Sequence, residues 1–164
     1  MKGRTNPYPG DEASAAALLR LADEYRAAAR ILLALGRRSE HLSFAPFRLT
    51  AIHAAELYLS VLLVHGGRSV ADVRALGHDV AARANLASEL GLKLRKRTLQ
   101  HLGALRESRE YLVSRYGVET RSLSQVNRLI ATLEEMSEKV RISILASKNE
   151  VEGVLTESAE AARQ

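Results

Sequence analysis

The stretch from His53 to Leu63 constrains the fold more than any other part of the chain, because it is apolar almost all the way round. Its only imidazole and carboxyl groups belong to His53 and Glu56, which lie three residues apart and therefore share one side of a helix. A helix that is apolar on every side is typical of the centre of a bundle, where other helices cover it. The sequence therefore predicts an all-α protein built around this segment.

Helical spacing and helix-stop residues predict an up-and-down bundle of four to five helices with a long C-terminal helix. The expected helices cover 11–35, 46–65, 78–90 and 94–116, with a short helical segment over 69–76 and a last helix that starts near 122 and keeps a heptad-like spacing. Asp11 is expected to cap the first helix, and Ser122 with Gln125 the last. Residues 1–10 are predicted to form a flexible arm, 11–147 the bundle and 148–164 a polar helical tail.

Composition excludes several classes of function. The 164 residues include no cysteine, which excludes disulfides, thiolate metal sites and a cysteine nucleophile. The five histidines are scattered without the spacing of a zinc motif, so neither a metal nor another cofactor is predicted. Because Arg48, Glu56 and Arg68 interrupt the most apolar region, no membrane span is expected, and a cytoplasmic location is predicted.

Three short motifs follow one another along the predicted helices. These are Ala54-Ala55-Glu56, Gly77-His78-Asp79-Val80 and Ser114-Arg115-Tyr116-Gly117. In this order they resemble the HEPN family (higher eukaryotes and prokaryotes nucleotide-binding domain), and they are similar to the C-terminal helical domain of kanamycin-type nucleotidyltransferases. The resemblance implies a helical bundle, often paired as a homodimer, whose central glutamate corresponds to Glu56.

The same resemblance directs the search for catalytic residues, since HEPN ribonucleases use an Arg and a His four to six residues apart, paired across a dimer. Arg48 with His53 and Arg95 with His101 have this spacing. Neither pair lies where the family motif usually does, and no histidine follows His101. Such an enzyme would be a metal-independent endoribonuclease, with His as general acid or base and Arg as phosphate stabiliser.

Glu56 is expected to lie in a polar core together with His53, His78, Arg109 and Arg115. We expect an arginine such as Arg109 or Arg115 to neutralise the buried carboxylate and fix the register of the helices. A ligand site at the same residues is the alternative. His78 and Asp79 begin a helix directly after Gly77. Asp79 is predicted to support the positive end of the helix dipole, and His78 to cap the helix or contact a neighbouring loop.

The formal charge of +5 comes mostly from arginine, with 19 Arg against 5 Lys. Arginine favours planar partners such as phosphates and carboxylates. The one compact basic cluster consists of four residues near a predicted helix start and is a candidate for phosphate contact: Lys93, Arg95, Lys96 and Arg97. A solvated charged face is the alternative interpretation.

Three functions are compatible with these patterns. The first is a non-catalytic HEPN-like bundle that binds a nucleotide, RNA or a partner protein such as a nucleotidyltransferase acting in trans. The second is a HEPN-type ribonuclease toxin of a toxin–antitoxin pair, with a displaced Arg/His pair. The third is a structural helical adaptor, which the long final helix would suit because an apolar stripe without a bundle to cover needs another chain.

Overall fold

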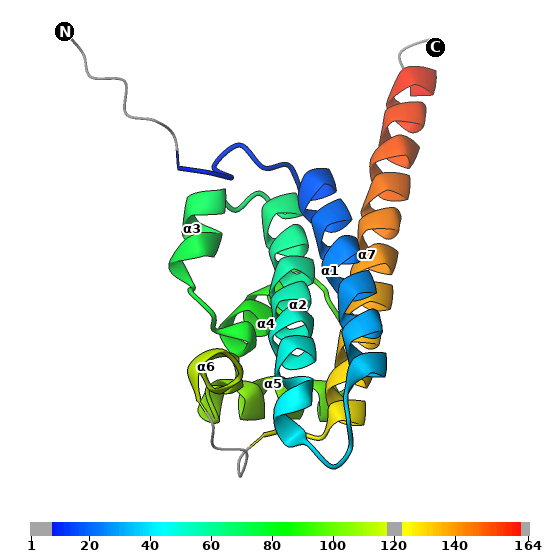
Figure 1. Cartoon of the computed structure of the whole chain (residues 1–164). Helices are drawn as coiled ribbons and strands as arrows, with labels where there is room; N and C mark the ends of the chain where they lie inside the picture. The colour runs from blue at the N-terminus through cyan, green and yellow to red at the C-terminus, as the bar shows by residue number, and fades with distance from the viewer. Residues whose placement is uncertain (1–7, 118–122, 162–164) are drawn as a thin grey trace, which may run out of the picture.

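The computed structural model describes residues 8–117 and 123–161, which form seven α-helices and one short 3-10 helix without a β-strand (Figure 1). The elements are α1 (Ala15–Leu35), η1 (His41–Phe44), α2 (Ala45–His65), α3 (Val70–Ala75), α4 (Val80–Glu89), α5 (Lys96–Glu107), α6 (Glu110–Tyr116) and α7 (Val126–Ala161). The prediction of an all-α bundle with a long C-terminal helix is confirmed. The helices outnumber the expected four to five, mainly because one predicted helix is broken in two.

Helix α2 lies at the centre of the bundle, as its apolar sequence predicts. It packs against α1 and α7 on one side and against α4 and α6 on the other (Figure 1). Fourteen of its 21 residues are buried, Tyr58 and Phe47 being the largest side chains that are fully covered. The stretch 41–65 is also long and apolar enough to cross a membrane by composition alone, but 78% of its most apolar window is buried inside this bundle.

The start of α1 differs from the prediction. Ser14 rather than Asp11 caps the helix, because its hydroxyl accepts a hydrogen bond from the backbone N–H of Ala17. Asp11 instead forms an ion pair with Arg74 of α3, and the Arg74 guanidinium lies 3.9 Å from the centre of the Tyr8 ring. The end of the predicted flexible arm is therefore held against α3, while residues 1–7 lie outside the described residues.

The helix predicted over 94–116 is broken at Ser108 and Arg109. Arg109 adopts a left-handed backbone conformation with φ of 50°, and a new helix, α6, starts directly after it. Arginine adopts this conformation at a cost, which is why neither helical spacing nor turn residues indicated the break. The consequence is that Leu112 and Tyr116 are exposed, whereas Glu110 is completely buried.

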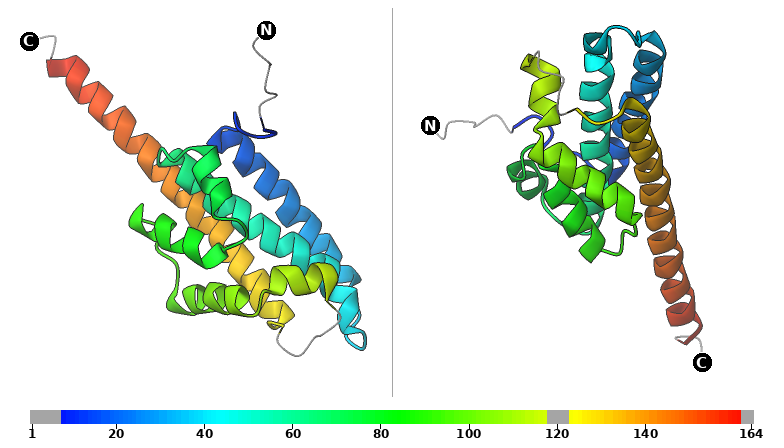
Figure 2. Two further views of the ribbon diagram at one scale, coloured as in Figure 1. Left: turned by 90° about the vertical axis from the view of Figure 1, so that its left-hand side faces the viewer. Right: turned by 90° about the horizontal axis from the view of Figure 1, so that it is seen from below.

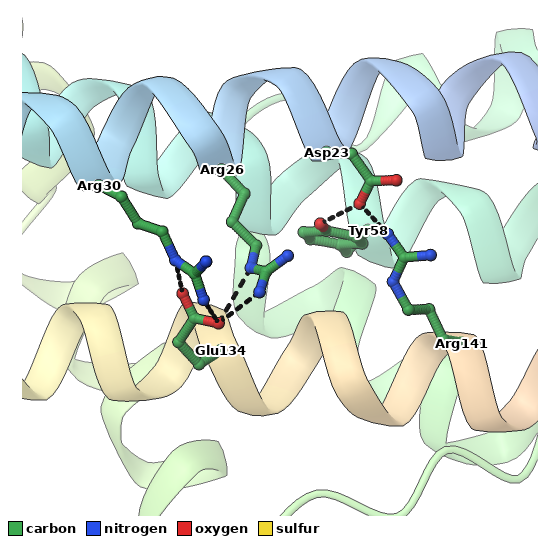
Figure 3. A network of polar contacts seen from close by, with 6 residues as sticks. All are labelled: Asp23, Arg26, Arg30, Tyr58, Glu134 and Arg141. Atoms are coloured by element: carbon green, nitrogen blue, oxygen red, sulfur yellow. Dashed lines mark hydrogen bonds and ion pairs between the residues drawn. The ribbon is translucent and has the colours of Figure 1, made fainter.

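Polar side chains join α1 to α7 across the surface of α2 (Figure 3). Arg26 and Arg30 both donate hydrogen bonds to the Glu134 carboxylate, over distances of 2.7–3.0 Å. Although partial burial raises the pKa of Glu134, the hydrogen bonds from Arg30 and Arg26 lower it below its usual value. A second bridge lies further along, where Asp23 accepts from the Tyr58 hydroxyl at 2.6 Å and pairs with Arg141.

Helix α7 starts at Val126, and the backbone carbonyl of Gln125 accepts hydrogen bonds from the first turn. The predicted capping partner Ser122 lies outside the described residues. Leu129, Leu133, Met136 and Val140 bury one side of the helix against the core. The helix then continues to Ala161 and projects past the other helices (Figures 1 and 2).

Candidate functional site

The central glutamate of α2 is paired with two histidines. Glu56 is 5% exposed, and both its carboxylate oxygens lie 3.2 Å from Nδ1 of His78. His53, one helical turn earlier, has its Nδ1 3.7 Å from the same carboxylate. His78 lies in the link before α4, so the Gly77-His78-Asp79 motif and the Ala-Ala-Glu motif meet in space. Asp79, rather than the predicted His78, caps α4, since its carboxylate accepts from the N–H of Ala82 at 2.8 Å.

The expected arginine partner of Glu56 is corrected by the structure. Within the described residues, no ion pair joins Glu56 to Arg109 or Arg115. Arg109 is exposed at the break between α5 and α6, and Arg115 is exposed on α6. The arginine buried near Glu56 is Arg83 of α4, 6% exposed, which donates to Ser60 Oγ at 3.0 Å and to the Gly77 carbonyl at 2.6 Å.

The environment of Arg83 links it to the same carboxylate. Burial lowers the pKa of Arg83 below its usual value, and the negative charges of Glu56 and Asp79 oppose this effect. Ser60 in turn donates to the Glu56 backbone carbonyl at 2.7 Å, so α2 and α4 are joined by a continuous polar chain. Arg83 and Ser60 therefore join α4 to the backbone of α2 at Glu56, whereas the Glu56 carboxylate itself contacts the imidazoles of His53 and His78.

An open pocket of about 250 Å³ lies beside His53 and is lined by Tyr25, Leu49, Thr50, His53, Tyr111 and Arg115. The Tyr111 ring stacks on His78 with 3.8 Å between ring centres, and its hydroxyl accepts from Arg115 Nη1 at 3.1 Å. Tyr25 packs edge-on against His53 at 4.5 Å. The pocket therefore combines aromatic rings with one arginine and an imidazole that is 35% exposed.

A second buried carboxylate lies near the junction of α5 and α6. Glu110 is 0% exposed and pairs with Arg48 Nη1 at 2.5 Å. It also accepts hydrogen bonds from the backbone N–H and the hydroxyl of Ser124, while Arg48 donates to the Ser124 carbonyl at 2.7 Å. Arg48 is therefore committed to a closed ion pair at the start of α7 and does not converge with His53.

The second predicted catalytic pair is also separated. His101 is 7% exposed, and its Nδ1 lies 2.8 Å from Thr132 Oγ1. Burial lowers the pKa of His101 to about 4, and the positive charge of Arg128 adds to this lowering. Arg95 is exposed at the start of α5 with its Nε 3.9 Å from Glu135. The geometry within one chain thus supports neither Arg48 with His53 nor Arg95 with His101 as a catalytic pair.

The predicted phosphate-contact cluster is exposed but divided. Lys93 lines a hollow of about 420 Å³ beside α7, and Arg95 lines a different one of about 480 Å³. The Glu135 carboxylate accepts hydrogen bonds from the backbone N–H of Arg95 at 2.7 Å and from Thr98 Oγ1 at 2.6 Å. A carboxylate of the chain itself therefore lies at the helix start, where Lys96 and Arg97 were expected to help bind phosphate.

Sequence reasoning missed three members of the candidate site, namely Arg83, Tyr25 and Tyr111. Arg83 stands among alanines in the segment Ala81-Ala82-Arg83-Ala84, and a lone cation in a run of small residues could have indicated a buried arginine. Tyr25 carries no comparable signal, because it looks like any other residue of the apolar stripe of α1. Among the described residues, no group of three or more His, Asp or Glu side chains is placed to hold a metal ion.

Comparisons of the chain with protein-family models, with curated proteins and with solved structures found no match. The resemblance to the HEPN family therefore rests on the three motifs and their order.

Proposed function

We propose that the chain is a HEPN-like helical bundle that binds a nucleotide or a short RNA segment without cleaving it. The observation that carries this proposal is the pocket in which Arg115 and His53 lie beside Tyr25 and Tyr111. Arginine binds phosphate through a planar set of N–H donors, and aromatic rings stack on bases whatever their sequence. The positive formal charge of the chain favours the same class of ligand.

The size of the pocket limits what it can enclose. Pockets for drug-sized ligands usually measure roughly 300–1,000 Å³, and this one measures about 250 Å³. It can hold a base or a single phosphate, with the rest of the ligand in solvent. Glu56 contributes by positioning His53 and His78, because its carboxylate lies behind both imidazoles.

The non-catalytic part of the proposal follows from the state of the candidate catalytic residues. A general base must reach the proton that it removes, and His101 is buried against Thr132. An arginine that stabilises a pentavalent phosphate must be accessible, and Arg48 is 7% exposed in its pair with Glu110. The ribonuclease hypothesis therefore has less support than the binding hypothesis.

The test is isothermal titration of the full chain with adenosine triphosphate, uridine triphosphate and a six-nucleotide RNA. Arg115→Ala should weaken binding about tenfold, because a hydrogen bond to a charged group contributes about 1.5 kcal/mol. Arg109→Ala is the matched control, since this exposed arginine precedes α6 and does not line the pocket. RNA incubated with the wild-type chain should stay intact.

Three results would overturn the proposal. One is the absence of binding to all three probes, which would direct attention to a protein partner. Another is unchanged affinity in Arg115→Ala together with a loss in Lys96→Ala or Arg97→Ala, which would move the ligand to the basic cluster. RNA cleavage that disappears in His53→Ala would show a ribonuclease in place of a binding protein.

A further inference from the structure

The C-terminal part of α7 carries an interaction surface that the bundle does not use. The helix continues to Ala161 and projects beyond α1 and α2 (Figures 1 and 2). A short helix standing alone in water is marginal, and Gly153 lowers the helix propensity of this one further. On the packed part of the same helix, Ile142 and Leu145 are 52% and 60% exposed. The projecting segment and the exposed apolar side chains of Ile142 and Leu145 both point to a partner that covers the C-terminal half of α7.

The charges of this half are separated along the helix. Residues 139–148 contain three cations and no acid, namely Lys139, Arg141 and Lys148, of which Arg141 pairs with Asp23 of α1. Residues 149–160 contain four acids and no cation, namely Glu150, Glu152, Glu157 and Glu160. A second copy running in the same direction would place like charges side by side. A second copy running in the opposite direction would place each basic part against an acidic part.

We propose that the C-terminal halves of α7 from two copies of this chain pair antiparallel, with the two-fold axis beside Asn149. This register places Lys139 within one turn of Glu157 and Glu160 of the partner subunit. It places Leu145 opposite Gly153 of the partner subunit, where the missing side chain allows close approach. A second copy of this chain, paired in this way, would account for three observations: the segregated charges, the exposed Ile142 and Leu145, and the projecting helix.

A groove at the edge of the same surface fits the acidic end of the partner helix. Leu90, Lys93, Lys139 and Ile142 are among the residues that line this hollow of about 420 Å³. Its two lysines lie on different elements, the link before α5 and α7 itself. Lys93 therefore adds a cation from outside α7, next to the basic part of the helix. This pairing surface is separate from the pocket at Arg115, so it does not depend on the proposed function.

The absence of cysteine from the chain makes the direction of pairing measurable. Asn149→Cys in the full chain should give a disulfide-linked dimer in mild oxidant, because the two sulfurs meet at the axis. Glu160→Cys should give none: eleven residues at 1.5 Å each separate it from the axis, so the two cysteines lie about 33 Å apart, far beyond disulfide reach. Disulfides at both positions would show parallel pairing, and disulfides at neither position would show that this surface is not paired. Either result overturns the proposal.

Charge reversal tests the register by sedimentation equilibrium. Lys139→Glu with Lys148→Glu, and separately Glu150→Lys with Glu160→Lys, should each raise the dimer dissociation constant about 10- to 100-fold, because four ion pairs become repulsive. An equimolar mixture of the two double variants should form a heterodimer, since each reversed charge then lies opposite a reversed charge of the other sign. Glu12→Lys with Glu24→Lys, two exposed positions on α1 and before it, is the control with an equal charge change and should leave the dimer intact. A wild-type chain that is monomeric at 100 μM, or a mixture that stays monomeric, overturns the proposal.

Discussion

Glu110 and Glu56 are both buried carboxylates, yet they differ in the groups that contact them. Glu110 is enclosed by Arg48 and by the backbone and hydroxyl of Ser124, so charge and hydrogen bonds are provided from inside the fold. Glu56 instead contacts the partly exposed imidazoles of His53 and His78, and its negative charge acts on the buried Arg83. Burial alone therefore does not distinguish a structural ion pair from a candidate binding site. The distinction lies in how exposed the groups that contact the carboxylate are.

Among the changes at the two carboxylates, removing Arg48 should have the largest effect on stability. Arg48→Met should lower the free energy of unfolding by about 3–5 kcal/mol, because it leaves the Glu110 carboxylate buried without its cation. Urea unfolding followed by circular dichroism measures this loss. The double variant Arg48→Met with Glu110→Leu should recover most of it, since no unpaired charge remains. A loss below about 1 kcal/mol in Arg48→Met would mean that water reaches this pair and that the region is not closed.

Protonation of His101 tests whether solvent is excluded from the buried contact between α5 and α7. The pKa of His101 is lowered to about 4 in the fold, chiefly by burial and then by the charge of Arg128. The unfolded chain therefore binds more protons than the folded one between about pH 6.5 and pH 4. This stabilising contribution is complete above about pH 6.5 and is lost as the pH falls toward 4.

The expected loss of stability from this one group is about 2–3 kcal/mol between pH 7 and pH 4. Urea unfolding at a series of pH values measures it, and His101→Gln removes the titrating group as a control. The imidazole resonance in proton spectra should titrate near pH 4. Titration at the ordinary histidine pKa would show that solvent enters this part of the core.

The central helix could be predicted from the sequence, and the break in α5 and α6 could not. The apolar run from His53 to Leu63, Pro46 near its start and Gly66 at its end define α2 by local rules alone. At Arg109 the local rules favour a continuous helix. The break exists because it places Glu110 against Arg48 and Ser124, a long-range requirement that no spacing reveals.

The same distinction applies to the candidate site. His53, Glu56, His78 and Arg115 were identified from motifs, because their spacing or neighbours set them apart. The arginine near Glu56 was predicted wrongly, since several arginines were available and only the packing of α4 on α2 brings the charge of Arg83 close to this carboxylate. Sequence periodicity thus locates a polar residue on a helix face, and tertiary packing decides which charge it meets.

Removing the charge of Glu56 should have a smaller effect than removing Arg48. Glu56→Gln keeps the size of the side chain and a hydrogen-bond acceptor for His78, but it removes the negative charge that opposes the desolvation of Arg83. We expect a loss of about 1–2 kcal/mol in the free energy of unfolding, measured with urea. A loss as large as that in Arg48→Met would show that both carboxylates are equally structural and would remove the basis for the comparison.

The smallest expected effect lies at Arg109, which joins α5 to the helix that carries Glu110, Tyr111 and Arg115. Its φ of 50° is costly for a side chain with a Cβ and free for glycine. Arg109→Gly should therefore stabilise the fold by about 0.5–1 kcal/mol, or raise the thermal midpoint by a few degrees. Arg109→Ala keeps the Cβ and should leave stability unchanged, which separates the backbone effect from loss of charge. Destabilisation by glycine would mean that the Arg109 side chain itself helps to hold α6, and with it both carboxylate regions, in place.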